Sequence, residues 1–166
     1  FYNINEFSEI IEKSKIPFIL ILDQISDVRN FGAIIRTAEI SGVDGIIIQN
    51  SSSAPINSDT VKTSAGAIFN IPICKVSHIK DAIYLLKQLK IKIYGASEKA
   101  EKNIYQTNFK SSQAIIMGSE GKGLSKSILA LCDELIKIPL LGKIESLNVS
   151  VACGTILYEI VRQRGF

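Results

Sequence analysis

Short apolar runs alternate along the chain with longer amphipathic segments. The runs are four to six residues long, as expected for strands buried on both faces. They predict strands at residues 18–22, 45–49, 71–76, 91–96, 114–117 and 135–138. The amphipathic segments predict helices at residues 31–41, 79–89, 125–131 and 146–164, with a short one at 59–67. Strands that alternate with helices favour an α/β domain with a mostly parallel sheet flanked by helices.

The length of 166 residues suits one compact domain. We expect residues 1–16 to form an N-terminal linker or helix and residues 17–166 to form the domain itself. Apolar residues make up 46% of the chain and charged residues 21%, which is enough apolar material for a core. No apolar run reaches the length of a membrane-spanning helix. The first residues lack the basic-then-apolar order of a signal peptide.

Cysteine and histidine content narrows the possible chemistry. Cys74, Cys132 and Cys153 are odd in number and widely spaced, which argues against a disulfide framework or a zinc site. We therefore expect core cysteines, no metal and a reducing cytoplasm. The single histidine, His78, lies where a strand meets a helix, which favours a loop or capping residue over a catalytic one. A net charge of +3 permits an RNA partner without requiring one.

The first segment with candidate chemistry follows the strand at 18–22. Asn30 lies at the expected start of the next helix, where its side chain could cap backbone amides or meet a ligand. Arg36 lies off the apolar face of that helix and is free to reach a phosphate. An ordinary cap and a solvated arginine are the simpler interpretation of this segment taken alone.

A second segment, residues 117–123, reads Met-Gly-Ser-Glu-Gly-Lys-Gly and follows a strand. Its glycines would let the backbone approach a ligand closely. Their order differs from the GxGxxG of dinucleotide sites, and no Ser or Thr follows the lysine as in phosphate-binding loops. Glu120 would repel a phosphate and suits a cationic ligand, an arginine or backbone amides. A tight turn with a surface glutamate is the alternative.

The third segment, residues 138–152, leads from the last strand into the final helix. Ser146, Asn148 and Ser150 crowd the expected helix start, where free amides could bind an anionic group or where these residues are ordinary caps. Ligands of parallel sheets bind beyond the carboxyl ends of the strands. The three segments, together with Ala96, follow such ends and therefore predict one site.

Together these segments resemble the SpoU (TrmH-type) RNA ribose 2′-O-methyltransferases of the SPOUT superfamily, over nearly the whole chain. Asn30 with Arg36 and the segments 117–123 and 146–152 carry the resemblance, and Lys62-Thr-Ser-Ala-Gly-Ala67 adds to it. Asn103-Ile-Tyr-Gln106 and Arg162-Gln-Arg164 look most like the RlmB-type branch of the family. Members of that branch methylate a guanosine ribose in 23S ribosomal RNA.

The resemblance implies an α/β domain whose C-terminal part forms a deep trefoil knot around S-adenosylmethionine. It also implies a homodimer in which the final helix contributes to the interface. The implied catalytic residues are Asn30, Arg36, Glu120 and Asn148. The implied cofactor contacts are Ala96, Gly118, Ile138, Leu140, Ser146, Leu147 and Asn148.

Several RNA substrates are compatible with these motifs. RlmB-type enzymes usually carry an N-terminal RNA-binding domain, and this chain begins just before the first catalytic strand. We therefore expect either a catalytic fragment or a minimal member of the family. Methylation of a transfer-RNA ribose is the first alternative, and a non-catalytic RNA-binding knot protein is the second. A nucleotide-dependent oxidoreductase is a third, disfavoured by the order of the glycines.

Overall fold

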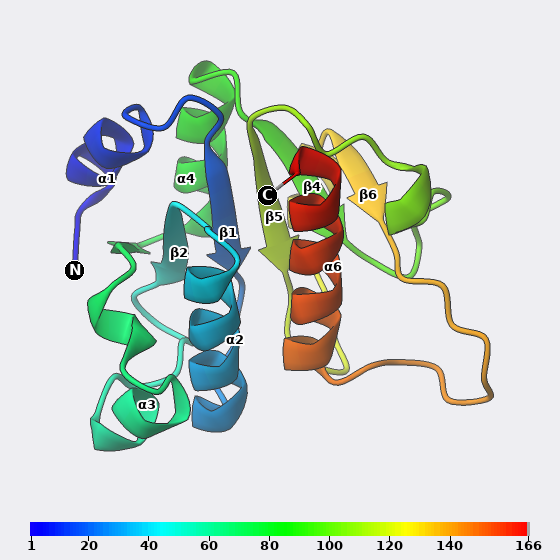
Figure 1. Ribbon diagram of the computed structural model, residues 1–166, viewed down its shortest axis with the longest axis horizontal. Helices are drawn as coiled ribbons and strands as arrows, with labels where there is room; N and C mark the ends of the chain where they lie inside the picture. Colours follow the sequence, from blue (N-terminus) through cyan, green and yellow to red (C-terminus); the bar gives the residue numbers. More distant parts are fainter. Residues whose placement is uncertain (166) are drawn as a thin grey trace.

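The computed structural model describes residues 1–165 and shows a single parallel sheet between two layers of helices (Figure 1). The strand order is β3-β2-β1-β5-β4-β6, and every pairing in the sheet is parallel. The predicted α/β class is confirmed. The strands are β1 (Phe18–Leu22), β2 (Gly45–Gln49), β3 (Ile73–Val76), β4 (Lys92–Ala96), β5 (Gln113–Met117) and β6 (Glu134–Ile136).

Each face of the sheet is covered by its own helices. Helices α2 (Val28–Ile40), α3 (Ser58–Thr63) and α6 (Val149–Arg164) lie on one face, and α1 (Ile4–Ile11), α4 (Ile79–Gln88) and α5 (Lys126–Leu131) lie on the other. Along β1, Leu20 and Leu22 pack toward α2 and α6, while Ile19 and Ile21 pack toward α1 and α4. Burial on both faces explains why the strands are continuous apolar runs.

Strand boundaries agree closely with the sequence predictions, whereas several helix starts do not. Helix α2 begins three residues before the predicted start, because Asp27 rather than Asn30 is its N-cap. Helix α6 begins at Val149 with Asn148 as its N-cap, and not at residue 146. The predicted helix at 59–67 ends at Thr63, since Ala65 and Gly66 have φ of 52° and 80°, which no right-handed helix continues. A separate 3₁₀ turn follows at Ala67–Phe69.

The N-terminal helix is part of the packed structure. Phe7 and Ile11 are fully buried against the sheet, and the Phe7 ring fills the space where a side chain at Gly45 would lie. Tyr2 forms a parallel bridge to Cys74 at the edge strand β3. Helix α1 therefore contributes to the same core as the strands.

All three cysteines have free thiols. Cys74 and Cys153 are buried, and Cys132 is half-buried. Burial raises the pKa of Cys74 and Cys132 to about 11 and that of Cys153 to about 12, so the thiols stay protonated at neutral pH. His78 occupies the N-cap position of α4, as expected, without a capping hydrogen bond from its side chain.

None of the helices in residues 1–165 is both long enough and apolar enough to cross a membrane. The same residues contain no group of three or more His, Cys, Asp or Glu side chains that could hold a metal ion.

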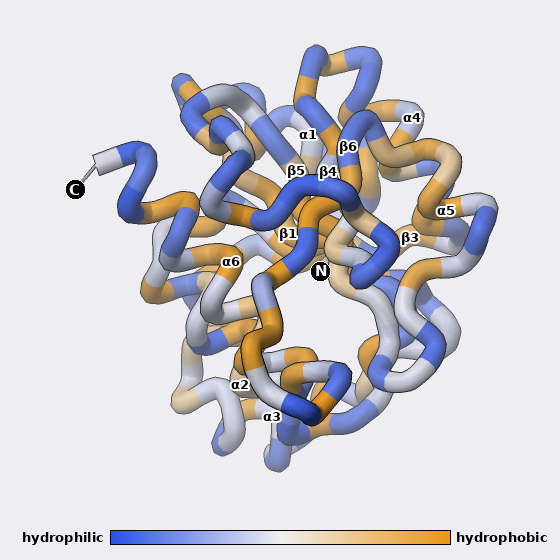
Figure 2. The backbone as a smooth tube through the Cα atoms, turned by 90° about the vertical axis from the view of Figure 1, so that its right-hand side faces the viewer, coloured by the Kyte–Doolittle hydropathy of each residue, from blue (hydrophilic) through white to orange (hydrophobic). Residues whose placement is uncertain are grey.

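The segment between β6 and α6 extends away from the rest of the domain (Figure 1). It lies nearest the viewer in Figure 2 and carries both hydrophobic and hydrophilic positions. Leu141 and Ile144 in this segment are 98% and 79% exposed. Its far end returns to the carboxyl edge of the sheet, where α6 begins.

Candidate active site

Side chains from the three candidate segments meet at the carboxyl edge of the sheet. The Asn148 amide nitrogen donates to Asn30 Oδ1 at 3.0 Å and to Glu120 Oε1 at 3.1 Å. Asn148 lies 118 residues from Asn30 and 28 residues from Glu120 in the chain. Helices α2 and α6 both begin at this edge (Figure 1), which brings the residues together. The expectation of one shared site is met for these three residues.

The first turn of α6 is closed to an anion. The Val149 N–H donates to Glu120 Oε1 at 3.1 Å, and the N–H groups of Ser150 and Val151 donate to Asn148 Oδ1 at 3.0 and 3.3 Å. The expectation that this helix start offers free amides is therefore wrong, because the helix binds a carboxylate of its own chain. Of the partners considered for Glu120, a backbone amide is the one observed, that of Val149.

Asn30 lies in the first turn of α2 and is half-buried. Its backbone N–H donates to Asp27 Oδ1 at 2.8 Å, so it is itself capped and caps nothing. The capping interpretation of Asn30 is wrong, and its side chain is left for Asn148. Because Oδ1 accepts from Asn148, the Asn30 amide nitrogen remains as a donor for a ligand oxygen.

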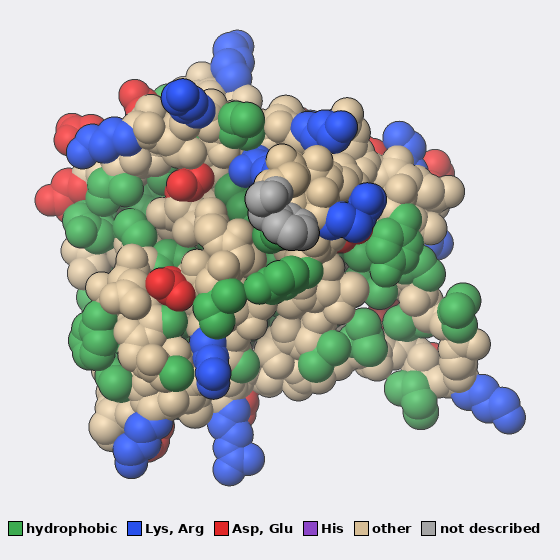
Figure 3. All heavy atoms as spheres, viewed as in Figure 1, with side chains coloured by type: hydrophobic (Ala, Val, Ile, Leu, Met, Phe, Trp, Pro, Cys, Tyr) green, Lys and Arg blue, Asp and Glu red, His purple; other side chains and the backbone are tan. Residues whose placement is uncertain are grey.

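Arg36 lies six residues beyond Asn30 on α2, about 9 Å along the helix axis. Its side chain is exposed, as predicted, and Figure 3 shows basic side chains on the surface over α2 and α3. Within residues 1–165 the Arg36 guanidinium forms no hydrogen bond or salt bridge, and Asn30 and Glu120 bind Asn148 instead. The guanidinium is free to bind a phosphate from solvent.

The glycine-rich loop after β5 folds back on itself and presents Glu120. Ser119 and Gly123 form an antiparallel bridge, with the Gly123 N–H donating to the Ser119 carbonyl at 2.9 Å. A side chain at Gly118 would collide with the Gly123 backbone, and Gly121 and Gly123 have φ of 80° and 62°. The loop thus requires glycine at all three positions.

The expected cofactor residues fall into two groups. Leu140, Ser146 and Leu147 line a cavity of about 470 Å³ formed by residues 139–147. Ala96 is the last residue of β4, and Gly118 follows the adjacent strand β5. Ala96 and Ile138 each pack against the core on the α6 side of the sheet. The cavity lining is largely apolar, which fits an adenine ring.

Asp23 is a further candidate that the sequence did not single out as a site residue. It follows β1 directly, is 6% exposed, and its N–H donates to the Met117 carbonyl at 2.9 Å, next to the glycine loop. Burial raises the pKa of its carboxyl group. Within residues 1–165 the carboxylate forms no hydrogen bond. The sequence feature that could have identified Asp23 is an acidic residue placed immediately after a buried strand.

Comparison with known proteins identifies the class. Residues 17–158 match the SpoU rRNA Methylase family. The 23S rRNA (guanosine-2′-O-)-methyltransferase RlmB of Yersinia pestis is 38% identical, over 99% of this chain and 67% of the relative. The chain thus spans about two thirds of the length of this curated relative.

Solved structures agree with this class. The SpoU methyltransferase AviRb from Streptomyces viridochromogenes in complex with AdoMet matches with a TM-score of 0.87 at 27% identity, over 94% of this chain and 61% of that one. The A. aeolicus TrmH/SpoU tRNA modifying enzyme matches with a TM-score of 0.82 at 30% identity, over 97% of this chain and 82% of that one.

An α/β domain with this glycine loop and this junction of three segments is that of an RNA methylase. The chain belongs to the SpoU rRNA methylase family. The predicted family is confirmed. The family consists of methyltransferases that use S-adenosylmethionine, which also confirms the predicted class of enzyme and its cofactor.

Proposed function

We propose that this domain transfers a methyl group from S-adenosylmethionine to the ribose 2′-hydroxyl of a guanosine in 23S ribosomal RNA. The observation that carries the proposal is the junction of Asn30, Glu120 and Asn148 through the Asn148 amide. The substrate is the one that the name of the Y. pestis relative gives.

Arg36 is assigned to the RNA backbone. When bound, S-adenosylmethionine would supply an electrophilic methyl group, which would pass to the ribose 2′-oxygen as its bond to sulfur breaks, leaving S-adenosylhomocysteine and a released proton. A neutral hydroxyl is a poor nucleophile, so its proton must be lost or loosened during transfer. An arginine side chain hardly ever gives up its proton, which excludes Arg36 as a simple base. Instead its guanidinium binds the phosphate beside the reacting ribose and stabilises the developing negative charge on the oxygen.

The polar junction holds the reacting groups in place. Glu120 and the first turn of α6 fix the Asn148 side chain, and Asn148 fixes Asn30. The Asn30 amide nitrogen then points a donor at a ribose or phosphate oxygen. Holding oxygen and methyl carbon in line is itself a large part of catalysis.

The apolar loop is assigned to the cofactor. Leu140 and Leu147, each 40% exposed, are available to wall an adenine ring together with Ile138. Ala96, Gly118 and Ser146 supply backbone and hydroxyl groups around it. We also propose that residues 137–148 pass through a trefoil knot. We further propose a homodimer with the N-terminal half of α6 at its interface, which the 53% exposed Val151 side chain supports.

Incubating the chain with methyl-labelled S-adenosylmethionine tests the proposal. Unmodified 23S ribosomal RNA and bulk transfer RNA are offered separately, and the products are digested to nucleosides. The proposal expects 2′-O-methylguanosine from ribosomal RNA only. Product from transfer RNA alone would support the second candidate, which the likeness to the A. aeolicus tRNA modifying enzyme favours. Cofactor binding without transfer to either RNA would support a non-catalytic RNA-binding protein, and no cofactor binding would contradict a methyltransferase.

A further inference from the structure

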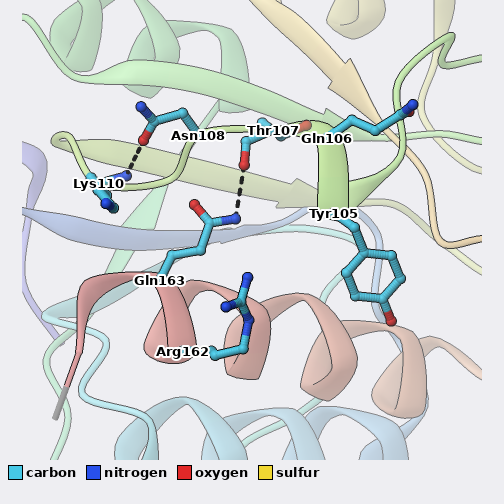
Figure 4. A pocket seen from close by; sticks show the side chains of 7 residues that line it. All are labelled: Tyr105, Gln106, Thr107, Asn108, Lys110, Arg162 and Gln163. Carbon is cyan, nitrogen blue, oxygen red and sulfur yellow. Dashed lines mark hydrogen bonds between the residues drawn. The ribbon is translucent and has the colours of Figure 1, made fainter.

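A second cavity lies on the α6 face of the domain, away from the junction of Asn30, Glu120 and Asn148 (Figure 4). It has a volume of about 430 Å³ and an open mouth. One wall is the last turns of α6, and the other is the 3₁₀ turn η2 (Ile104–Gln106) with the segment that leads into β5. We call this cavity the η2–α6 groove. Its lining residues are Tyr105, Gln106, Thr107, Asn108, Lys110, Arg162 and Gln163.

Hydrogen bonds fix the two walls of the groove to each other. Gln163 Nε2 donates to the Thr107 carbonyl at 2.8 Å, and the Phe109 N–H donates to Gln163 Oε1 at 2.7 Å. Arg164 also binds the carbonyls of Phe109 and Ser111 from α6. The groove is thus a preformed feature of the folded domain.

Arg162 is held over the groove by a buried carboxylate. Its Nε and Nη2 donate to the two oxygens of Glu159 at 2.9 and 2.8 Å. The Glu159 side chain is 5% exposed, whereas that of Arg162 is 68% exposed. Figure 4 shows the guanidinium directed from α6 into the space beside the Tyr105 ring. Within residues 1–165 the remaining nitrogen, Nη1, has no hydrogen-bond partner and can donate to an acceptor from solvent.

The chemistry of the groove matches one kind of ligand. Tyr105 is 61% exposed and offers an aromatic face on which an unpaired base can stack. The Gln106 and Asn108 side-chain oxygens accept from the Asn103 and Lys110 N–H groups, which leaves their amide nitrogens to donate to base edges. Lys110 and Arg162 can bind phosphate. A protein partner would instead be expected to meet an apolar centre, which this groove lacks.

We infer that the η2–α6 groove binds single-stranded RNA that flanks the methylated nucleotide. The inference rests on the proposed function, because that function supplies the RNA. Arg162 lies 14 residues beyond Asn148, about 21 Å along α6. The bound segment is therefore outside the reacting nucleotide and contributes to RNA affinity. The groove is also where residues 103–106 and 162–164, which carry the likeness to the RlmB-type branch, come together.

The test compares Tyr105→Ala and Lys110→Ala with a matched control pair. Tyr84→Ala and Lys80→Ala remove an exposed tyrosine and an exposed lysine from α4, on the opposite face of the sheet. Arg162 is left intact, since its removal would strand the buried Glu159. The probe is an unmodified 23S ribosomal RNA fragment, with filter binding, methyl-transfer kinetics and S-adenosylmethionine calorimetry measured for each variant.

Tyr105→Ala is expected to weaken RNA binding about tenfold, the usual effect of losing one stacked base. Lys110→Ala is expected to lower the slope of log affinity against log salt by about one. Both should raise the KM for RNA and leave kcat and cofactor affinity unchanged, while the control pair changes nothing.

RNA affinity equal to the control pair would overturn the inference, as would a change in oligomeric state, which would make the groove a protein interface. If the wild-type chain binds the cofactor and no RNA, the groove assignment fails and the cofactor assignment stands. If it binds no cofactor, the proposed function fails as well.

Discussion

Gly32 of α2 lies directly against the Thr63 side chain at the end of α3, which fills the space that any side chain at position 32 would need. The Thr63 hydroxyl also lies 3.3 Å from the Val28 carbonyl in the first turn of α2. The segment Lys62–Ala67 is thereby joined to the helix that carries Asn30 and Arg36. This contact fixes the orientation of α2 and of the two side chains assigned to RNA.

Replacing Gly32 by alanine should therefore destabilise the protein. The added methyl group overlaps Thr63, and overpacking of this kind costs about 1–3 kcal/mol. Gly154→Ala in α6 is the matched control, because its methyl group would meet only Thr37 Cγ2 at 3.6 Å. Alanine is the better helix former, so this control should be stabilised by up to about 1 kcal/mol. Urea unfolding measures both, and equal effects of the two substitutions would refute the contact.

Glu120 should matter for methyl transfer more than for stability. Glu120→Ala removes the acceptor shared by Asn148 and Val149. A hydrogen bond to a charged group contributes about 1.5–3 kcal/mol. Loss of this hydrogen bond in the transition state would slow methyl transfer about ten- to hundredfold. Glu120→Gln keeps an oxygen at the same place and should lose less. Single-turnover rates at saturating cofactor measure the effect of each substitution. Indistinguishable rates for Glu120→Gln and Glu120→Ala would show that methyl transfer does not depend on the Glu120 oxygen.

Arg36→Lys should transfer methyl groups well below the wild-type rate. Lysine keeps the positive charge and loses the planar fork that binds two phosphate oxygens at once. The rate is measured against pH, with Arg36→Ala as the lower limit. Full activity of the lysine variant would mean that a point charge suffices, and the assigned phosphate clamp would be wrong.

Asp23→Asn should change how stability depends on pH. Burial raises the pKa of the folded-state carboxyl, so the folded protein favours the protonated form. The cost of the buried charge is absent below the unfolded pKa of about 3.9 and grows as pH rises through the folded pKa. Asparagine carries no such cost. The stability of the Asp23→Asn variant relative to the wild type should therefore increase from acid to neutral pH in thermal melts. A difference in stability that does not change with pH would show that the Asp23 carboxyl is not titrating with a raised pKa.

The apolar pattern predicted β1 and β2 with their observed ends, because strands buried on both faces leave an uninterrupted run. Helix starts were harder to predict. Asp27 and Asn30 are both good caps, and local sequence does not choose between them. In the structure Asp27 caps the helix, and the Asn30 side chain accepts from Asn148, 118 residues away. Contacts of that range are decided by tertiary packing.

Some residues of the candidate site were predicted from the sequence, and others were not. Asn30, Glu120 and Asn148 were predicted from strand ends and resemblance, and the structure brings them into hydrogen-bond contact. Asp23 was missed as a site residue because a buried carboxylate is visible only once its surroundings are known. The η2–α6 groove was missed because Gln163 meets Thr107 across 56 residues of chain.

The junction at Asn148 is proposed to position a guanosine ribose for 2′-O-methylation. The test measures single-turnover methyl transfer from labelled S-adenosylmethionine to unmodified 23S ribosomal RNA, for the wild type and for Asn148→Ala. The modified position is mapped by its resistance to alkaline cleavage. We expect one 2′-O-methylguanosine position for the wild type. The transfer rate of the variant should fall about tenfold or more, because one hydrogen bond in the transition state is lost. Label on a base, or equal rates for the two proteins, would contradict this proposal.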